Sequence, residues 1–293
     1  MRPAIGAALL VAVVVMLGPE TVLTGVRSLD APTLLIGAAL AAWSTAFASW
    51  RWVTIARACG LSLNFRDALV SYYRSQLLNS TLPGGVLGDV DRAAWQARHQ
   101  RDIPRGAGAV AVERTVGQTV LLLGAAVVMV LWGSGAGFSP AVLTGLAVAC
   151  VAFAGLTVVV GWRTQVLARG RTSIGFFVRI VTASALAIMG YVGTFLLAAH
   201  AVGVTAPATE LLPLAVLVIA GSAIPVNFAG WGPREGVAAW AFATAGLGAE
   251  LGLSVSVAYG LISLVAVLPG LIPIALGRRP VEHPMDTKEI PMA

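Results

Sequence analysis

The sequence predicts an all-α polytopic membrane protein whose two halves repeat one layout in opposite orientation. Three observations support this prediction. The 293-residue chain is 58% hydrophobic and only 11% charged, whereas a soluble domain carries about 25% charged residues. Its arginines gather in alternate loops, as in proteins whose topology is set by positive charge. Two glycine-rich loops of similar sequence interrupt apolar stretches that are too short to cross a bilayer.

Six apolar stretches are long enough to be full membrane spans, because a helix of about 20 residues crosses a hydrocarbon core of about 30 Å. The expected spans are 4–26, 33–57, 107–132, 140–161, 174–200 and 252–276. A turn rich in Gly and Ser at 133–139 separates repeat one (about 1–135) from repeat two (about 136–277). We expect one membrane domain over 1–277 and a disordered cytoplasmic tail at 278–293, which contains prolines and charges.

Each half also contains shorter segments. The stretch 68–80 has 13 residues, or about 20 Å of helix at about 1.5 Å per residue. We therefore expect 68–98 to enter and leave the membrane from one side, as a re-entrant hairpin. The stretches 211–224 and 237–247 are expected to form the second hairpin, from the other side. Each half then follows the order span, span, re-entrant hairpin, span.

The charges predict the orientation of this layout. One set of loops holds Arg2, Arg278, Arg279 and the arginines within 51–66, 98–105 and 163–171. The opposite loops hold Glu20, Arg27, Asp30, Glu210 and Glu250. The positive-inside rule then places both termini in the cytoplasm. Expected anchors in the membrane–water interfaces are Trp43, Trp50, Trp52, Trp95, Trp132 and Trp162, which lie mostly near the span ends.

The two glycine-rich loops share the positions of three residues. In the loop 83–92 a proline is followed five residues later by a glycine and nine residues later by an arginine, and the loop 225–234 has the same spacing. A polar break at membrane depth survives only where it lines a cavity or is buried in protein. Two such breaks in corresponding positions of two halves indicate a binding site at the centre of an inverted repeat.

Arg92 and Arg234 are the expected ligands of an anionic headgroup, because a guanidinium is always charged and holds phosphate through two hydrogen bonds. The second arm of each hairpin begins at its loop, where the helix N-terminus also favours an anion. The full set of expected substrate-binding residues is Arg92, Arg234, Asn79, Pro83, Gly84, Gly85, Gly88, Asp89, Asn227, Gly230, Trp231, Gly232 and Glu235. Candidates for proton coupling or ion pairing are Asp91, Glu113 and Arg114.

A second interpretation gives the same charges a structural role. Arg92 would pair with Asp89 or Glu113, and Arg234 with Glu235 or Glu113. A charge at membrane depth needs either a partner or a water-filled cavity, so the sequence leaves both interpretations open.

The sequence contains no motif of hydrolytic or group-transfer chemistry: there is no Walker motif, no G-x-S-x-G and no H-E-x-x-H. The protein is therefore expected not to be an enzyme. The cysteines Cys59 and Cys150 and the histidines His99, His200 and His283 are scattered, so we expect neither a metal nor a cofactor. The net charge of +6 comes from arginines in particular loops and does not indicate a nucleic-acid partner.

Three motifs carry a resemblance to a known family: NSTLPGGVLGDVDR at 79–92, ER at 113–114 and IPVNFAGWGPREG at 224–236. With them the chain resembles, over about 1–277, the lysylphosphatidylglycerol synthase transmembrane-region family, the flippase-like domain of the multiple peptide resistance factor. The resemblance implies a multi-pass protein of the bacterial or archaeal inner membrane that moves a lipid between leaflets. The chain shows no aminoacyl-transferase segment, so the resemblance does not by itself carry lysyl-phosphatidylglycerol over as the substrate. Stand-alone members are similar to proteins of polyprenyl-phosphate, glycolipid or hopanoid pathways.

The resulting hypothesis is a flippase for an anionic phospholipid or a lipid-linked phosphate, with the headgroup bound between the two opposed hairpins. The first alternative is a transporter that recycles polyprenyl phosphate. The second is a non-transporting membrane scaffold for a lipid-linked glycosyltransferase. The expected partners are the lipid substrate and a lipid-modifying enzyme. The sequence predicts neither the headgroup nor the oligomeric state.

Overall fold

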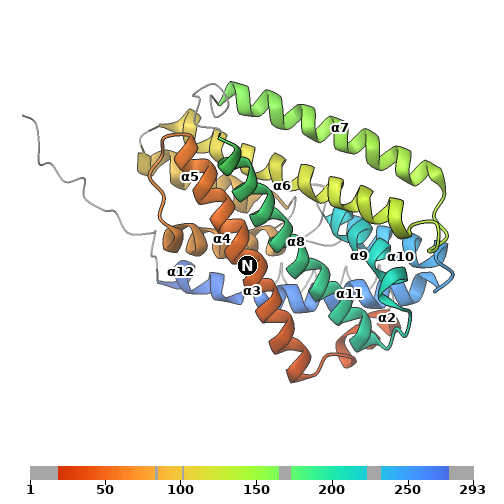
Figure 1. Cartoon of the computed structure of the whole chain (residues 1–293). Coiled ribbons are helices and arrows are strands. Elements are labelled where there is room, and N and C mark those ends of the chain that lie inside the picture. The colour runs from red at the N-terminus through yellow and green to blue at the C-terminus, as the bar shows by residue number, and fades with distance from the viewer. Residues whose placement is uncertain (1–18, 83–84, 101, 165–172, 223–231, 277–293) are drawn as a thin grey trace, which may run out of the picture.

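The computed structural model describes residues 19–82, 85–100, 102–164, 173–222 and 232–276 (Figure 1). These residues form helices and connecting turns, and no strand occurs among them. The helices are α2 (Pro19–Arg27), α3 (Ala31–Ala58), α4 (Phe65–Thr81), α5 (Leu87–Gln100), α6 (Ile103–Trp132), α7 (Pro140–Arg163), α8 (Ile174–Val202), α9 (Ala208–Ser222), α10 (Pro233–Thr244), α11 (Ala249–Ala266), the 3₁₀ turn η1 (Leu268–Gly270) and α12 (Leu271–Ala275).

Five stretches of the described chain are long and apolar enough to cross a membrane. They are α3, α6, α7, α8 and the stretch Ala249–Ala275, which contains α11, η1 and α12. This confirms the prediction of an all-helical protein with several membrane helices. The remaining expected span, 4–26 at the start of the chain, lies mostly outside the described residues. Only its last part appears, as α2. The 278–293 tail also lies outside them.

The last expected span is not one continuous helix. α11 ends at Ala266, and the chain continues through η1 into the short α12. Pro269 lacks the N–H group that a continuous helix would use, so it favours an interruption. A Cβ atom at Gly270 would lie 2.5 Å from the carbonyl oxygen of Tyr73. The glycine therefore lets this broken segment pack directly on the backbone of α4.

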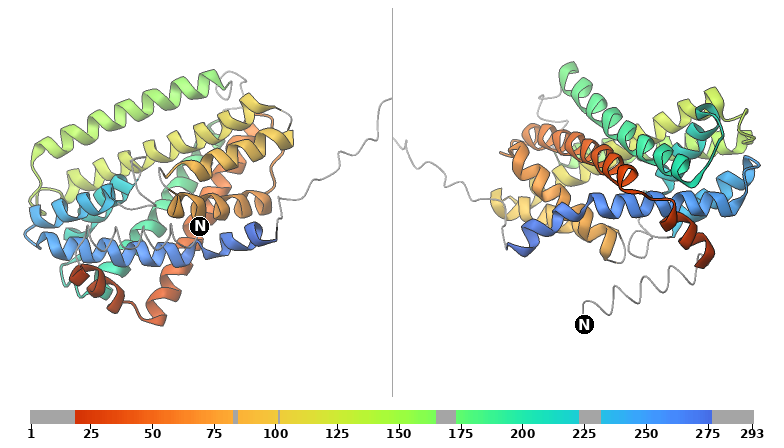
Figure 2. Two further views of the ribbon diagram at one scale, coloured as in Figure 1. Left: turned by 180° about the vertical axis from the view of Figure 1, so that it is seen from behind. Right: turned by 90° about the horizontal axis from the view of Figure 1, so that it is seen from below.

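Helices α3 and α8 cross the middle of the molecule side by side in opposite directions (Figures 1 and 2). The Ser44 hydroxyl donates to the carbonyl oxygen of Ala187 at 2.9 Å, and the Trp43 indole donates to that of Leu186 at 2.9 Å. A Cβ atom at Gly190 would lie 2.2 Å from the Ser44 hydroxyl oxygen. Small residues thus let the two backbones approach closely, as is common between membrane helices.

Two helical hairpins flank this central pair. α4 packs against α5, and α9 packs against α10. α5 has 14 residues and α10 has 12, or about 21 Å and about 18 Å of helix, which is less than the hydrocarbon core of about 30 Å. The lengths therefore match the expected hairpin arms, and re-entrance itself stays a prediction. α7 lies at the outside of the molecule, against α6 (Figure 1).

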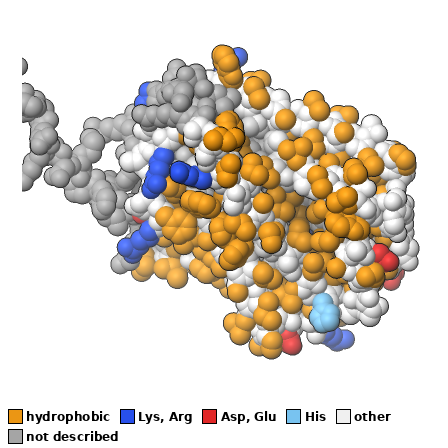
Figure 3. Space-filling model, in the orientation of Figure 1, with side chains coloured by type: hydrophobic (Ala, Val, Ile, Leu, Met, Phe, Trp, Pro, Cys, Tyr) orange, Lys and Arg blue, Asp and Glu red, His pale blue; other side chains and the backbone are white. Residues whose placement is uncertain are grey.

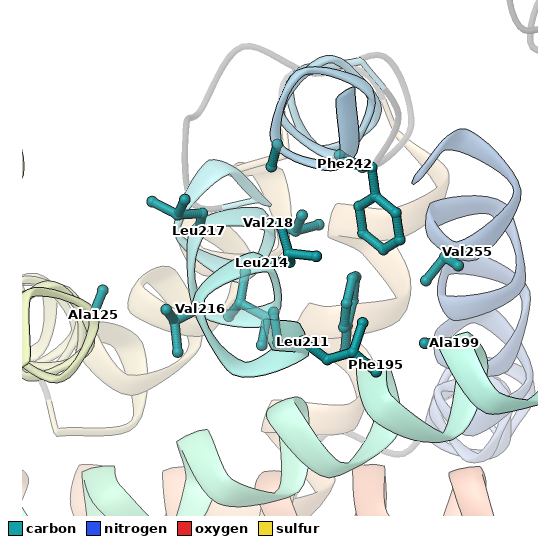
Figure 4. Packing of buried hydrophobic residues seen from close by; sticks show 14 of the residues in the cluster. Ala125, Phe195, Ala199, Leu211, Leu214, Val216, Leu217, Val218, Phe242 and Val255 are labelled. Carbon is teal, nitrogen blue, oxygen red and sulfur yellow. The ribbon is translucent and has the colours of Figure 1, made fainter. Parts of the chain in front are cut away.

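The second hairpin forms the larger apolar core. Leu214 and Val218 of α9 are fully buried. Phe195 of α8 and Phe242 of α10 meet beside them, with ring centroids 6.4 Å apart (Figure 4). α4 is different, because its interior face is polar, and this polar face provides much of the site described below.

We predict that thiol reagents label T209C and E250C from one side of the membrane and R66C from the other. Residues 209 and 250 flank the second hairpin and all three positions are exposed. The native Cys59 and Cys150 are buried, so background labelling should be low. The measurement is labelling of intact and permeabilised cells. Labelling of T209C and E250C from opposite faces would make the hairpin a full crossing and would remove the basis for the repeat.

Candidate functional site

The carboxylate of Glu113 in α6 lies at the centre of a buried cluster of charges. Its side chain is 0% exposed. One oxygen accepts hydrogen bonds from the Arg51 guanidinium of α3, at 3.0 Å from Nε, and from the Tyr72 hydroxyl of α4, at 2.9 Å. The other accepts from Arg92 Nη2 of α5 at 2.8 Å. Arg51 also donates to the Ser184 hydroxyl of α8 at 3.1 Å. One carboxylate therefore ties four helices of the first half to α8.

Arg92 is enclosed by this cluster. Its side chain is 0% exposed, and its guanidinium carbon lies 4.3 Å from the ring centroid of Tyr72 and 4.6 Å from that of Trp52. The Trp52 indole is fixed in turn by a hydrogen bond of 3.0 Å to Gln96 Oε1. Cation–π stacking between two rings holds the guanidinium away from open space.

Asp89, at the start of α5, links the buried cluster to a more open region. Its carboxylate accepts from Arg92 at 3.1 Å, from Asn79 at 3.1 Å, and from Arg114. Asn79 also accepts a hydrogen bond of 2.7 Å from the backbone N–H of Gly88, which satisfies one of the free donors at the helix N-terminus. The Arg114 side chain is 50% exposed, whereas those of Arg51 and Arg92 are 9% and 0% exposed. Arg114 is therefore the most accessible arginine of the cluster.

The cluster carries one surplus positive charge among the described residues. The guanidiniums of Arg51, Arg92 and Arg114 face the carboxylates of Asp89 and Glu113, and three positive charges against two negative ones leave one. Asp91 is not part of this cluster, because it pairs with Arg74 at 2.9 Å. A charge away from water needs a partner or a polar cavity, so the surplus favours an anion beside Arg114.

The second loop ends in a smaller arrangement at the start of α10. Arg234 Nε donates to Glu235 Oε1 at 2.8 Å and to the Ser256 hydroxyl of α11 at 3.0 Å. The Arg234 guanidinium carbon lies 5.4 Å from the Tyr259 ring centroid. Glu235 accepts the backbone N–H of Gly232 at 2.6 Å, and Gly232 has a φ of +124°, a conformation that favours glycine.

Two adjoining cavities lie between the two arrangements, of about 210 Å³ and about 260 Å³. Both are lined by Gln76, Arg114, Tyr191, Ser222 and Tyr259. The first also reaches Arg51 and Asp89, and the second reaches Gly85 and Arg234. We call the two together the central cavity. Helices from both halves line it, and a residue of each glycine-rich loop reaches its second part.

The expected site residues fall into four groups. Asn79, Gly85, Asp89, Arg114 and Arg234 line the central cavity. Gly88, Arg92, Glu113, Gly232 and Glu235 make contacts beside it, and Asp91 forms the separate pair described above. Pro83, Gly84, Asn227, Gly230 and Trp231 lie outside the described residues. The structure contains the ion pairs that the structural interpretation predicts. Arg92 pairs with Asp89 and Glu113, and Arg234 pairs with Glu235.

The sequence interpretation missed several residues of the site. The sequence pattern groups Arg51 with the loop arginines, but Arg51 is buried and pairs with Glu113. The sequence pattern places Trp52 in the membrane–water interface, but its side chain is fully buried against Arg92. One signal was available, because Tyr72, Ser75, Gln76 and Asn79 recur at helical spacing and form a polar stripe along α4.

Comparison with protein families agrees with this architecture. The family model described as Lysylphosphatidylglycerol synthase TM region matches residues 2–270. The chain belongs to this family. A comparison with curated proteins gives no significant match. Membership in the lysylphosphatidylglycerol synthase TM family confirms the resemblance seen in the three motifs and covers both hairpins.

For this family member, we predict that Glu113→Gln destabilises the fold strongly. The substitution leaves Arg51 and Arg92 buried without their carboxylate, which typically costs about 3–5 kcal/mol. Thermal unfolding in detergent should show a clear loss of Tm. The matched control is Glu250→Gln, at an exposed position, which should unfold like the parent protein. An unchanged Tm for Glu113→Gln would mean that the ion cluster does not hold the fold.

We also predict that Gly88→Ala opens the first hairpin. A Cβ atom at this position would lie 2.0 Å from the carbonyl oxygen of Ser75, so α5 would have to move away from α4. Such overpacking costs about 1–3 kcal/mol. Gly124→Ala is the control, because among the described residues no atom beyond its chain neighbours and its own helix backbone lies within 4 Å of the added Cβ. Equal stability of the two variants, measured by thermal unfolding, would contradict the close approach of α4 and α5.

Proposed function

We propose that this protein moves an anionic phospholipid between the leaflets of the bacterial inner membrane, with the lipid phosphate bound in the central cavity. The observation that carries the proposal is the half-exposed Arg114 at the cavity wall, in a cluster with one surplus positive charge. The apolar chains would stay in the bilayer while the headgroup passes between the two halves. Membership in the family supports a membrane role for the chain.

The packing of the helices supports the inverted repeat on which this proposal rests. Exchanging α3 with α8, α4 with α9, α5 with α10 and α6 with α11 turns most contacts among these eight helices into other observed contacts. α5 packs on α6 as α10 packs on α11, and α3 packs on α4 as α8 packs on α9. α6 contacts α9, and α4 contacts η1 after α11. Proteins built in this way bind their substrate where the repeats meet.

The two loop arginines take different roles in this proposal. Arg114 and Arg234 line the cavity and would contact the phosphate. Arg92 is enclosed by aromatic rings and carboxylates, so it would act by holding Asp89 and Glu113 in position. In this proposal the phosphate is therefore bound by Arg114, and not by Arg92 as the sequence predicts. Both arginines pair with the carboxylate of Asp89.

The charge balance also ranks the substrates. A phosphodiester carries one negative charge, which matches the one surplus positive charge of the cluster. A phosphate monoester carries about 1.5 to 2 negative charges at neutral pH. We therefore place a phosphodiester lipid before a polyprenyl phosphate. A scaffold for a lipid-modifying enzyme would need no such cavity, and we propose that any such enzyme acts as a partner of the transporter.

We predict that Arg114→Gln slows translocation of labelled phosphatidylglycerol in proteoliposomes about tenfold or more. Loss of one charge-assisted hydrogen bond costs about 1.5–3 kcal/mol, and 1.4 kcal/mol is about tenfold. The Tm should change little, because the Arg114 side chain is half exposed. Arg66→Gln, at an exposed position outside the cavity, is the control and should keep the parent rate.

Three lipids separate the candidate functions in this assay. Faster movement of a polyprenyl phosphate than of phosphatidylglycerol would favour the recycling transporter. Translocation of phosphatidylcholine at the same rate as phosphatidylglycerol would exclude recognition of the net negative charge of the headgroup. Absence of translocation for every lipid would favour the scaffold, and a normal rate for Arg114→Gln would exclude Arg114 as the phosphate ligand.

A further inference from the structure

A second cavity lies away from the central one, in the surface between the end of α3 and the beginning of α8. Its volume is about 410 Å³. It is lined by Trp50, Thr54, Arg57, Ala58, Ser173, Phe176 and Arg179. We call it the α3–α8 groove. None of its residues contributes to the central cavity or to the ion cluster around Glu113.

The groove contains two arginines without an acidic partner among the described residues. Arg57 and Arg179 are both exposed, and neither forms an ion pair with a described carboxylate. None of the described residues that line the groove is acidic. The arginines of the central site differ, because Arg51, Arg92 and Arg114 each pair with a carboxylate. Two guanidiniums that line one concave surface form a site for an anion.

Other groups in the groove suit a phosphate. The Ser173 side chain caps α8 by accepting a hydrogen bond of 3.3 Å from the backbone N–H of Phe176, and its hydroxyl can still donate. The groove lies at the N-terminus of α8, a helix of 29 residues. The helix dipole favours negative charge at this end. These features add to the two arginines, which carry the argument.

The position of the groove suits a lipid rather than a soluble ion. α3 and α8 are both long and apolar enough to span the membrane, and the groove lies where the two spans end. On the face in Figure 3, the basic side chains lie mostly toward the end where α3 ends and α8 begins, and apolar side chains cover the middle. Trp50 and Phe176 line the groove, and Trp prefers the level of lipid headgroups.

We propose that the α3–α8 groove binds the phosphate of an anionic phospholipid from the leaflet at this end of the molecule. Arg57 and Arg179 hold the phosphate oxygens, and the acyl chains run along the apolar surfaces of α3 and α8. Arg57 lies six residues after Arg51 on α3, or about 9 Å along the helix. The groove is therefore a separate site beside the ion cluster. The inference does not require the protein to be a transporter.

The test is native mass spectrometry of the full-length protein titrated with phosphatidylglycerol, with phosphatidylcholine and with inorganic phosphate. The variant Arg57→Gln/Arg179→Gln should weaken the tightest phosphatidylglycerol binding by about tenfold or more, since it removes both charge-assisted contacts. The control is Arg66→Gln/Arg163→Gln, which removes two exposed arginines outside the groove. It should bind phosphatidylglycerol like the parent protein.

Several results would overturn the inference. An equal loss of binding in the two double variants would mean that the arginines act only through the overall positive charge of this side. Equal affinity for phosphatidylcholine would exclude recognition of an anionic headgroup. Binding of inorganic phosphate that phosphatidylglycerol does not displace would make the groove a site for a soluble anion.

Discussion

The buried carboxylate of Glu113 is the group on which the first half of the protein depends. It accepts hydrogen bonds from side chains of α3, α4 and α5 while it sits on α6, and Arg51 extends the same network to α8. Burial of a charge is costly unless every group around it is paired. This arrangement of helices satisfies the carboxylate, so the ion cluster helps to specify which helices meet and in what register.

The same cluster makes the central cavity basic. Arg92 is enclosed by carboxylates and aromatic rings, and Arg51 is buried against Glu113. Arg114 shares Asp89 with Arg92 and keeps half of its side chain exposed. The structural pairing of Arg92 and a role in binding are therefore compatible, because different arginines perform them. Glycines at the helix contacts complete the geometry. Gly88 and Gly270 allow α5 and the segment after α11 to approach the backbone of α4, which keeps the polar face of α4 turned to the cavity.

Much of this architecture could be predicted from the sequence, because long apolar runs and short interrupted ones differ in composition alone. The expected span 33–57 corresponds to α3, and 107–132 to the apolar part of α6. The roles of Arg51 and Trp52 could not be predicted in that way. Both lie near the end of an apolar run, where an arginine usually faces a loop and a tryptophan the interface. Their true partners, Glu113 and Arg92, are distant in sequence, and only the packing of α3 against the first hairpin brings them together.

The central claim is that the cavity between the two halves holds the phosphate of an anionic lipid beside Arg114. The most direct measurement is an experimental structure of the protein in nanodiscs that contain phosphatidylglycerol. The account predicts phosphate density within hydrogen-bonding distance of the Arg114 guanidinium, in the space bounded by Gln76, Tyr191 and Tyr259. Lipid density confined to the outer surface, with this space closed by protein side chains, would contradict it.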